Sequence, residues 1–203
     1  MSAPARREAI LDAALEEFAA NGFYETSLEG VAERAGISKA LIYEHFSSKR
    51  DLHEALLARY RQKLLERVIG TSSARTPELR LRAGADAFFG FVEENREPWR
   101  LMVRNPMEAG GEGGVGQRQA EMAHAVAALI HADTPQELEE GQTAEEADLR
   151  AELGGQQLVG AMRALANWWD DHREVPRERL VLALMNFCWT GLERVRRGDR
   201  WEP

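Results

Sequence analysis

Apolar residues recur every three to four positions along almost the whole chain, and this spacing is the strongest constraint on its fold. Ile10, Leu11, Ala14, Leu15 and Phe18 form one such stripe near the N-terminus. This period places apolar side chains on one face of an α-helix, whereas a half-buried strand needs strict alternation. Alternating runs rich in Val, Ile and Thr are missing. The sequence therefore predicts an all-α protein.

Start and stop signals divide the chain into its expected helices. A Ser or Thr with an acidic residue three positions later caps a helix N-terminus, and Gly is typical of a C-terminus. Caps with this acidic residue are predicted at Thr26 (with Glu29), Ser48, Thr134 and Thr143; caps without it are predicted at Ser38 and at Thr76, which precedes Pro77. The first expected helix ends at residues 21–22. The other expected helices span residues 26–35, 39–46, 49–69, 76–95, 97–105, 117–131, 144–171 and 176–197.

Composition bounds the class of protein. With 203 residues, 44% of them hydrophobic, the chain can form one or two globular domains. The single Cys188 excludes a disulfide scaffold. The longest strongly apolar stretch near the C-terminus, residues 180–192, is shorter than the roughly 20 residues of a membrane span. Charged residues interrupt the N-terminus and argue against a signal peptide. We therefore expect a cytoplasmic protein without a membrane partner.

The charge balance, taken alone, argues against a nucleic-acid-binding protein. The net charge is −8, and residues 1–60 carry 7 Lys/Arg against 10 Asp/Glu. However, exposed charges more than roughly 8–10 Å apart are largely screened at cellular salt. A local basic face can therefore still bind phosphate groups on an acidic protein.

Residues 26–49 predict a helix-turn-helix. Two short helices meet at residues 35–38, where Gly36 can supply the left-handed conformation of a tight turn. Val31, Ala32, Ile37 and Ile42 are spaced to pack the two helices together. In this arrangement the second helix can lie in the major groove of DNA. An ordinary helical hairpin with a solvated outer face is the alternative.

The outer face of the second helix carries groups suited to DNA. Lys39 in its first turn can donate to guanine, small apolar side chains can contact a thymine methyl, and Tyr43 can donate to a phosphate. Hydroxyls and free N–H groups at helix N-termini suit anions. Glu44 either accepts from cytosine or is solvated. The predicted DNA-binding residues are Thr26, Ser27, Ser38, Lys39, Ala40, Leu41, Tyr43, His45 and Lys49.

The same stretch resembles the DNA-binding domain of tetracycline-repressor-like (TetR family) transcriptional regulators. The resemblance covers residues 6–53, and its most discriminating part is the Tyr43-x-His45-Phe46-x-x-Lys49 ending. The other matching residues are Ile10, Ala13, Phe18, Gly22, Phe23, Thr26, Ser27, Ala35, Gly36, Ile37, Ser38, Leu41, Ser48 and Leu52. Ala40 departs from the Gly often found there.

The resemblance implies an N-terminal three-helix DNA-binding domain, residues 1–53, and a C-terminal helical ligand-binding and dimerisation domain, residues 54–203. It further implies a homodimer that represses nearby genes from a near-palindromic operator in double-stranded DNA until a small-molecule effector releases it. The helix expected over residues 49–69 joins the two domains and would transmit the effector signal. On the bacterial chromosome, the bound protein would be associated with the nucleoid.

The last two expected helices carry enough apolar surface to dimerise. One carries two stripes, the first through Leu158 and Trp169 and the second through Leu153 and Trp168, with small residues between. Two such helices suit a four-helix interface with a second copy, and burial within one chain is the alternative. The predicted dimer residues are Leu158, Met162, Leu165, Trp169, Leu184, Phe187 and Gly191.

Aromatic and Met residues are dense in the middle helices and predict an apolar effector pocket, although such a stripe also forms ordinary core. Arg163 either anchors an acidic ligand or belongs to a solvated polar stripe. The predicted ligand-binding residues are Phe88, Phe91, Trp99, Met102, Met122, Met162 and Trp168.

Other chemistry is sparse. The five His residues lack metal-ligand spacing, and the glycine-rich residues 110–116 lack the Lys-Ser/Thr of a phosphate loop. Cys188, between aromatic neighbours, is expected to be an inert buried thiol. We therefore predict no catalytic site, metal or cofactor. An enzyme built on the C-terminal helices and a helical adaptor that binds protein remain as alternatives.

Overall fold

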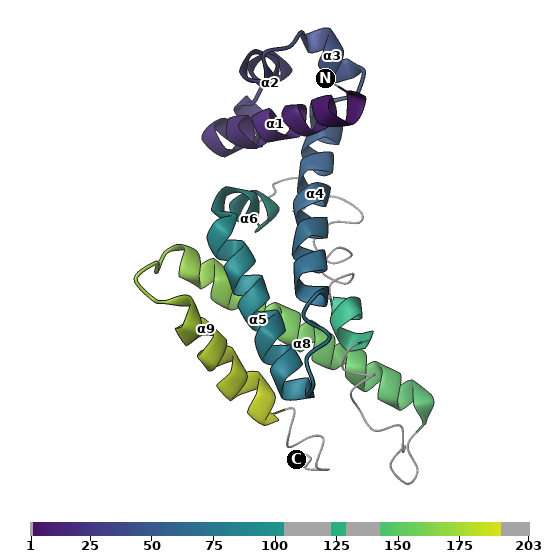
Figure 1. Cartoon of the computed structure of the whole chain (residues 1–203), viewed down its shortest axis with the longest axis vertical. Helices are drawn as coiled ribbons and strands as arrows, with labels where there is room; N and C mark the ends of the chain where they lie inside the picture. The colour runs from purple at the N-terminus through teal and green to yellow at the C-terminus, as the bar shows by residue number, and fades with distance from the viewer. Residues whose placement is uncertain (1, 104–122, 129–142, 192–203) are drawn as a thin grey trace. The chain divides into compact units, whose positions relative to one another are not determined.

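A computed structural model describes residues 2–103, 123–128 and 143–191. Every regular element in these ranges is a helix, which confirms the all-α prediction (Figure 1). The expected loop at residues 110–116, the Thr134 cap, and residues 117–122 and 129–131 of one expected helix lie outside the described residues. The described chain forms two compact units, residues 2–64 with 95–103 (unit 1) and residues 65–94 with 123–128 and 143–191 (unit 2).

Unit 1 is built on the N-terminal helices. Its elements are α1 (Ala3–Glu25), α2 (Leu28–Ala35), α3 (Lys39–Tyr43), the part of α4 (Lys49–Ile69) up to residue 64, and α6 (Arg96–Val103). Figure 1 shows α1, α2 and α3 gathered around the first turns of α4. Apolar side chains from these four helices form its core, among them Ile10, Leu11, Phe18, Ile42, Leu52 and Leu56.

The junction between α1 and α2 differs from the sequence prediction. The expected stop at residues 21–22 is a kink, because Gly22 has φ 72° and the helix resumes until Glu25. The predicted capping box at Thr26 is wrong: Ser27 caps α2 and accepts from the Gly30 N–H at 3.0 Å. The Thr26 hydroxyl instead donates to the Gly22 carbonyl oxygen at 2.7 Å. The Thr26 side chain therefore points into the α1–α2 junction.

The turn between α2 and α3 has the predicted form. Gly36 adopts φ 65°, ψ 33°, the left-handed region that closes a helix, and the Ile37 N–H donates to the Ala32 carbonyl at 3.0 Å. Ser38 caps α3 as predicted. However, α3 ends at Tyr43 rather than at residue 46.

The start of α4 explains the early end of α3. The Ser47 N–H donates to a carboxylate oxygen of Asp51 at 2.8 Å, and the Asp51 N–H donates to the Ser48 hydroxyl at 3.1 Å. This reciprocal cap needs an extended backbone just before α4. The buried Phe46 still donates its N–H to the Ile42 carbonyl at 2.9 Å, so a turn continues past α3 until this cap begins.

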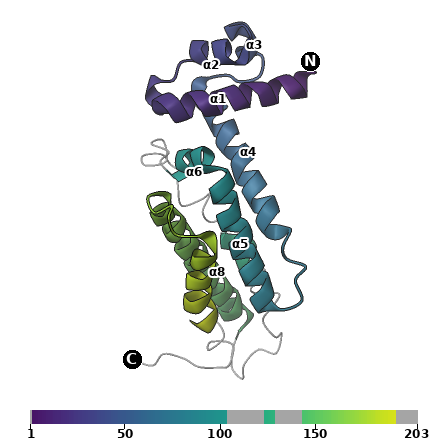
Figure 2. The ribbon, with the colours of Figure 1, turned by 60° about the vertical axis from the view of Figure 1, so that its left-hand side comes forward.

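Unit 2 packs three described helices together, α5 (Pro77–Glu94), α8 (Ala144–Asp170) and α9 (Arg177–Leu184), which lie side by side in Figures 1 and 2. Thr143 and Glu146 form the predicted capping box of α8. Trp169 is 2% exposed, its indole N–H donates to the Val175 carbonyl at 2.7 Å, and its ring meets Phe89 edge-on. These contacts fix the connection between α8 and α9.

The final expected helix changes its winding in the structure. After Leu184 the chain forms a π-helical turn over Met185–Trp189, in which the hydrogen bond spans five residues instead of four. Leu184 is 1% exposed and Phe187 is 78% exposed. Within the described ranges, no helix has the length and apolarity needed to cross a bilayer.

Candidate nucleic-acid interface

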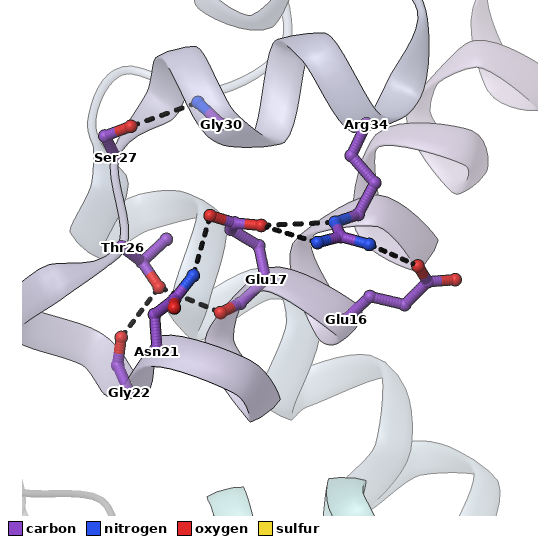
Figure 3. Close-up of polar contacts among 8 residues, drawn as sticks. All are labelled: Glu16, Glu17, Asn21, Gly22, Thr26, Ser27, Gly30 and Arg34. Carbon is purple, nitrogen blue, oxygen red and sulfur yellow. Dashed lines mark hydrogen bonds and ion pairs between the residues drawn. The ribbon is translucent and has the colours of Figure 1, made fainter.

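A carboxylate of α1 holds α2 in place (Figure 3). The side chain of Glu17 accepts from the Asn21 amide at 2.8 Å and from two guanidinium nitrogens of Arg34 at 3.0 and 3.1 Å. A Cβ atom on Gly30 would lie 2.6 Å from the Glu17 carboxylate, so glycine allows this close approach. The two carboxylates facing Arg34, from Glu17 and Glu16, raise its pKa. The network fixes the position from which α2 and the following turn extend.

The two hydroxyl residues at the start of α2 have different roles. Ser27 is exposed and caps the helix, with its hydroxyl accepting from the Gly30 N–H at the positive end of α2. Thr26 is 2% exposed, and its hydroxyl faces the Gly22 and Glu17 carbonyl oxygens. Thr26 therefore supports the junction from inside.

Helix α3 turns one side to the core and one side to solvent. Ile42 is fully buried, whereas Tyr43 is 52% exposed and Ala40 is exposed. Lys39, Leu41 and His45 are half-buried. Ala40 and Tyr43 thus lie on the outer side of α3, whereas His45 lies beyond its end, and contact with a DNA groove stays a prediction.

The ammonium of Lys39 is bound by the carboxylate of Glu29, which reaches across from α2. This contact raises the pKa of Lys39 and lowers that of Glu29, so both groups are charged at neutral pH. Sequence reasoning assigned Glu29 to a capping box and missed this contact. The partners are ten residues apart on different helices, and the cap pattern gave a competing explanation for the carboxylate.

Lys49, the first residue of α4, binds neutral groups. Its ammonium donates to the backbone carbonyls of Tyr24 at 2.9 Å and Thr26 at 2.8 Å, and it lies 4.8 Å from the ring centroid of Phe23. Lys49 therefore ties α4 to the α1–α2 junction. Because its partners carry no formal charge, its positive charge is not cancelled.

The residues predicted for the dimer divide into two groups. Leu158, Met162, Trp169 and Leu184 are buried within unit 2, so the first stripe of α8 serves as core. Leu165 is half-buried, and Phe187 and Gly191 are exposed. The second stripe of α8 faces outward: its ends, Leu153 and Trp168, are 54% and 46% exposed. Which surface dimerises stays a prediction.

The predicted ligand residues are not all part of one core. Phe88, Phe91 and Met162 are buried in unit 2, whereas Trp99 and Met102, buried and half-buried, belong to unit 1. Trp168 is exposed and stacks on His172 with 4.0 Å between ring centroids. Met122 lies outside the described residues. The effector site therefore stays a prediction.

Other site chemistry is limited among the described residues. No group of three or more His, Cys, Asp or Glu side chains there could hold a metal ion. Cys188, expected to be buried, is half-buried in the π-helical turn. Partial burial raises the pKa of its thiol, which disfavours a reactive thiolate.

Comparisons with known proteins agree with this geometry. Residues 10–56 match the family model "Bacterial regulatory proteins, tetR family", and residues 77–191 match "Tetracyclin repressor-like, C-terminal domain". The transcriptional activator FasR of Mycolicibacterium smegmatis is 31% identical over 94% of this chain and 84% of its own length.

Solved structures show the same architecture. A TetR-like regulator from Rhodococcus sp. RHA1 superposes with a TM-score of 0.73 at 27% identity, covering 95% of this chain and 98% of that one. The regulator FadR of Bacillus subtilis, solved with stearoyl-CoA, gives 0.65 at 20% identity, covering 95% and 99%. These relatives are transcriptional regulators and not enzymes, and the chain belongs to the TetR family of bacterial transcriptional regulators.

Proposed function

We propose that this regulator is a homodimeric repressor that binds a near-palindromic operator and is released by a small-molecule effector. The observation that carries the proposal is the outer face of α3. There Lys39, Ala40 and Tyr43 face away from the core, behind a turn that Gly36 closes. A helix presented in this way can enter a major groove with its first residues near the base edges.

Each predicted contact takes a role from its surroundings. Lys39 and the small side chains beside it would meet bases, whereas the Tyr43 hydroxyl would donate to a phosphate. Ser27 would place a phosphate at the N-terminus of α2. Lys49 would add positive charge beside that N-terminus while it holds the junction. Ser38 and Thr26 would act indirectly, through the α3 cap and the α1–α2 junction.

The homodimer is supported by the apolar residues left outside the core of unit 2. Trp168 and Leu153 on α8, and Leu182 and Phe187 near the C-terminal end of the described chain, are all between 46% and 78% exposed. An added Cβ atom on Gly160 or Gly191 would meet nothing within 4 Å, so a second copy could approach closely there. A twofold dimer would present two α3 helices to half-sites about 34 Å apart.

Effector release follows from linkage. An effector that prefers the conformation with misplaced α3 helices lowers DNA affinity by the factor by which DNA lowers effector affinity. We place the effector among the apolar residues of unit 2, including Phe88, Phe91 and Met162, and assign transmission to α4, which runs through both units. Stearoyl-CoA, the ligand solved with the Bacillus FadR, is a suitable first probe.

Activation is the second candidate function, because the 31% identical relative is named an activator. Both functions need the same interface and differ in the sign of the effect on transcription. Deleting the gene and measuring transcripts of its neighbours distinguishes them: transcripts rise for a repressor and fall for an activator.

Fluorescence anisotropy with full-length protein tests DNA recognition. The duplex upstream of the regulator's own gene is compared with a scrambled duplex at two salt concentrations. We expect at least about thousandfold tighter binding to the native duplex and a steep dependence on salt. The double variant Lys39→Ala/Tyr43→Ala should lose this preference. Equal weak binding to both duplexes would leave two explanations, an operator located elsewhere or a helical adaptor whose partner is not DNA, and selection from a randomised duplex library separates them.

A further inference from the structure

The ion pair between Glu29 and Lys39 lies on the face proposed to meet DNA. It joins the first turn of α2 to the first residue of α3, and the two side chains are 60% and 42% exposed. Nothing in the core requires this contact, because neither side chain is buried. The pair therefore places an acceptor and a donor side by side on the outer surface.

The two lysines of this face differ in whether a neighbouring carboxylate neutralises their charge. Lys49 binds backbone carbonyls and keeps its full positive charge, whereas Lys39 and Glu29 together have none. The DNA phosphates attract positively charged side chains whatever the base sequence. Lys49 is thus suited to any duplex, and the neutral pair adds little to non-specific attraction.

Hydrogen-bonding groups remain on both members of the pair. An ammonium has three donors and a carboxylate about four acceptor sites, and their mutual contact occupies only a part of them. In the major groove guanine presents the acceptors N7 and O6, and cytosine presents the N4 amino donor. A fixed ammonium–carboxylate pair therefore complements a G·C pair, with the order of the two bases set by α2 and α3.

We infer that Glu29 and Lys39 recognise one G·C base pair as a unit, and that Glu29 is a specificity-determining residue of this regulator. This inference rests on the proposed function, since it requires α3 in the major groove. Lys39 donates to guanine, Glu29 accepts from cytosine, and their mutual contact keeps Lys39 from a phosphate on other sequences. Removing Glu29 thus weakens discrimination in two ways, by losing an acceptor and by freeing a cation.

The test uses full-length protein and duplexes selected from a randomised library, so the operator need not be known. The variants are Glu29→Ala, Lys39→Ala and their combination. Glu33→Ala removes one carboxylate from the same helix without touching the ion pair and is the matched control. Glu29→Gln, a smaller change, guards against a general effect of side-chain truncation. Circular dichroism checks that every variant is folded.

We expect Glu29→Ala and Lys39→Ala to lose a G·C preference at the same position of each half-site, by about tenfold. The double variant should lose little more than either single one, because the two residues act together. Glu29→Ala alone should bind a scrambled duplex more tightly, with a salt slope steeper by about one, because Lys39 is free to bind a phosphate. Glu29→Gln should lose part of the preference, and Glu33→Ala should retain it.

Two results overturn the inference while leaving the proposed function intact. One is a wild type that selects a defined sequence together with a Glu29→Ala variant that behaves like Glu33→Ala. The other is loss of preference at different positions in the Glu29→Ala and Lys39→Ala variants. A wild type that selects no sequence overturns the proposed function and this inference together.

Discussion

The two units of the chain differ in how far sequence spacing determines which side chains face outward. In unit 1, Gly36 and the Ser38 cap fix where α3 starts, and Ile42 then faces the core while Tyr43 faces solvent. In unit 2, α8 carries two apolar stripes on one helix. Its spacing does not show which stripe the rest of the unit covers.

Packing decides the matter in unit 2. Trp169 and Leu158 face the core, with Phe89 of α5 against the Trp169 ring, and the stripe through Leu153 and Trp168 remains outside. Where caps and glycines mark the helix ends, the sequence thus predicts both the helices and the side chains that face the core. Periodicity alone predicts only that a helix forms.

Trp169→Ala should give the largest effect. Removing this buried ring leaves a cavity and a Val175 carbonyl without its donor, so the free energy of unfolding should fall by about 3–5 kcal/mol. Trp168→Ala, at the next position but 46% exposed, is the matched control. At protein concentrations low enough to keep the chain monomeric, it should change the free energy of unfolding by less than about 1 kcal/mol, because the proposed partner of Trp168 is a second copy. Urea denaturation measures both. Equal losses, or a larger loss for Trp168→Ala, would mean that the faces of α8 are assigned wrongly.

Phe187→Glu should produce the next largest effect, on self-association. Phe187 is 78% exposed, so a charge there disturbs the single chain little but would be buried in the proposed dimer. We expect dimer affinity to fall at least about thirtyfold, measured by sedimentation velocity over a range of concentrations.

Tyr24→Glu, at a 70% exposed aromatic residue of α1, is the control for the added charge and should leave association unchanged. A Phe187→Glu variant that stays fully dimeric would move the interface away from this part of unit 2.

Local signals explain most of what the sequence predicted correctly. The caps at Ser38, Ser48 and Thr143 and the left-handed Gly36 depend on residues within four positions of each other. The order of these signals also carried the family resemblance, which the comparisons confirm. The predicted domain boundary between residues 53 and 54 stays a prediction.

Long-range contacts explain what the sequence missed. Thr26 and Ser27 are both plausible caps, and carbonyls of α1 decide between them by binding the Thr26 hydroxyl. Glu29 reaches Lys39, and Lys49 reaches back 25 residues to Tyr24, by geometry that no local pattern records. The π-helical turn after Leu184 also lacks a sequence signal that we can identify.

Lys49→Met should affect both the stability of unit 1 and its DNA binding. It removes two charge-assisted hydrogen bonds to backbone carbonyls, and we expect a loss of about 1–2 kcal/mol in the free energy of unfolding. DNA affinity should fall similarly for native and scrambled duplexes, and the salt slope should decrease by about one.

The control is Lys63→Met, which removes the same charge from an exposed position of α4. It loses only the contact of its ammonium with the Tyr60 ring, 5.1 Å from the centroid, and should cost less than about 1 kcal/mol. A Lys49→Met variant that keeps its stability but changes its sequence preference would assign base reading to Lys49 and break the contrast with Lys39.

Glu94→Gln should have the smallest effect and should separate structural ion pairs from functional ones. The Arg67 guanidinium holds the pKa of Glu94 below its ordinary value of 4.5. A lowered pKa stabilises the folded state above that ordinary value, and the stabilisation is lost as the pH falls through the folded pKa. Because the side chains of Glu94 and Arg67 are 57% and 36% exposed, solvent screening limits the contribution of this ion pair to the free energy of unfolding at pH 7 to less than about 1 kcal/mol.

Thermal unfolding from pH 7 down to pH 3 should therefore show a small gap between wild type and Glu94→Gln that closes on acidification. Glu174→Gln, at an exposed position after α8, controls for the lost charge. A gap that widens on acidification would contradict the lowered pKa. DNA binding should not change in this variant, because Arg67 and Glu94 both belong to unit 2. A loss of sequence preference as large as that expected for Glu29→Ala would show that a surface ion pair affects recognition wherever it lies, and the contrast between the two units would then fail.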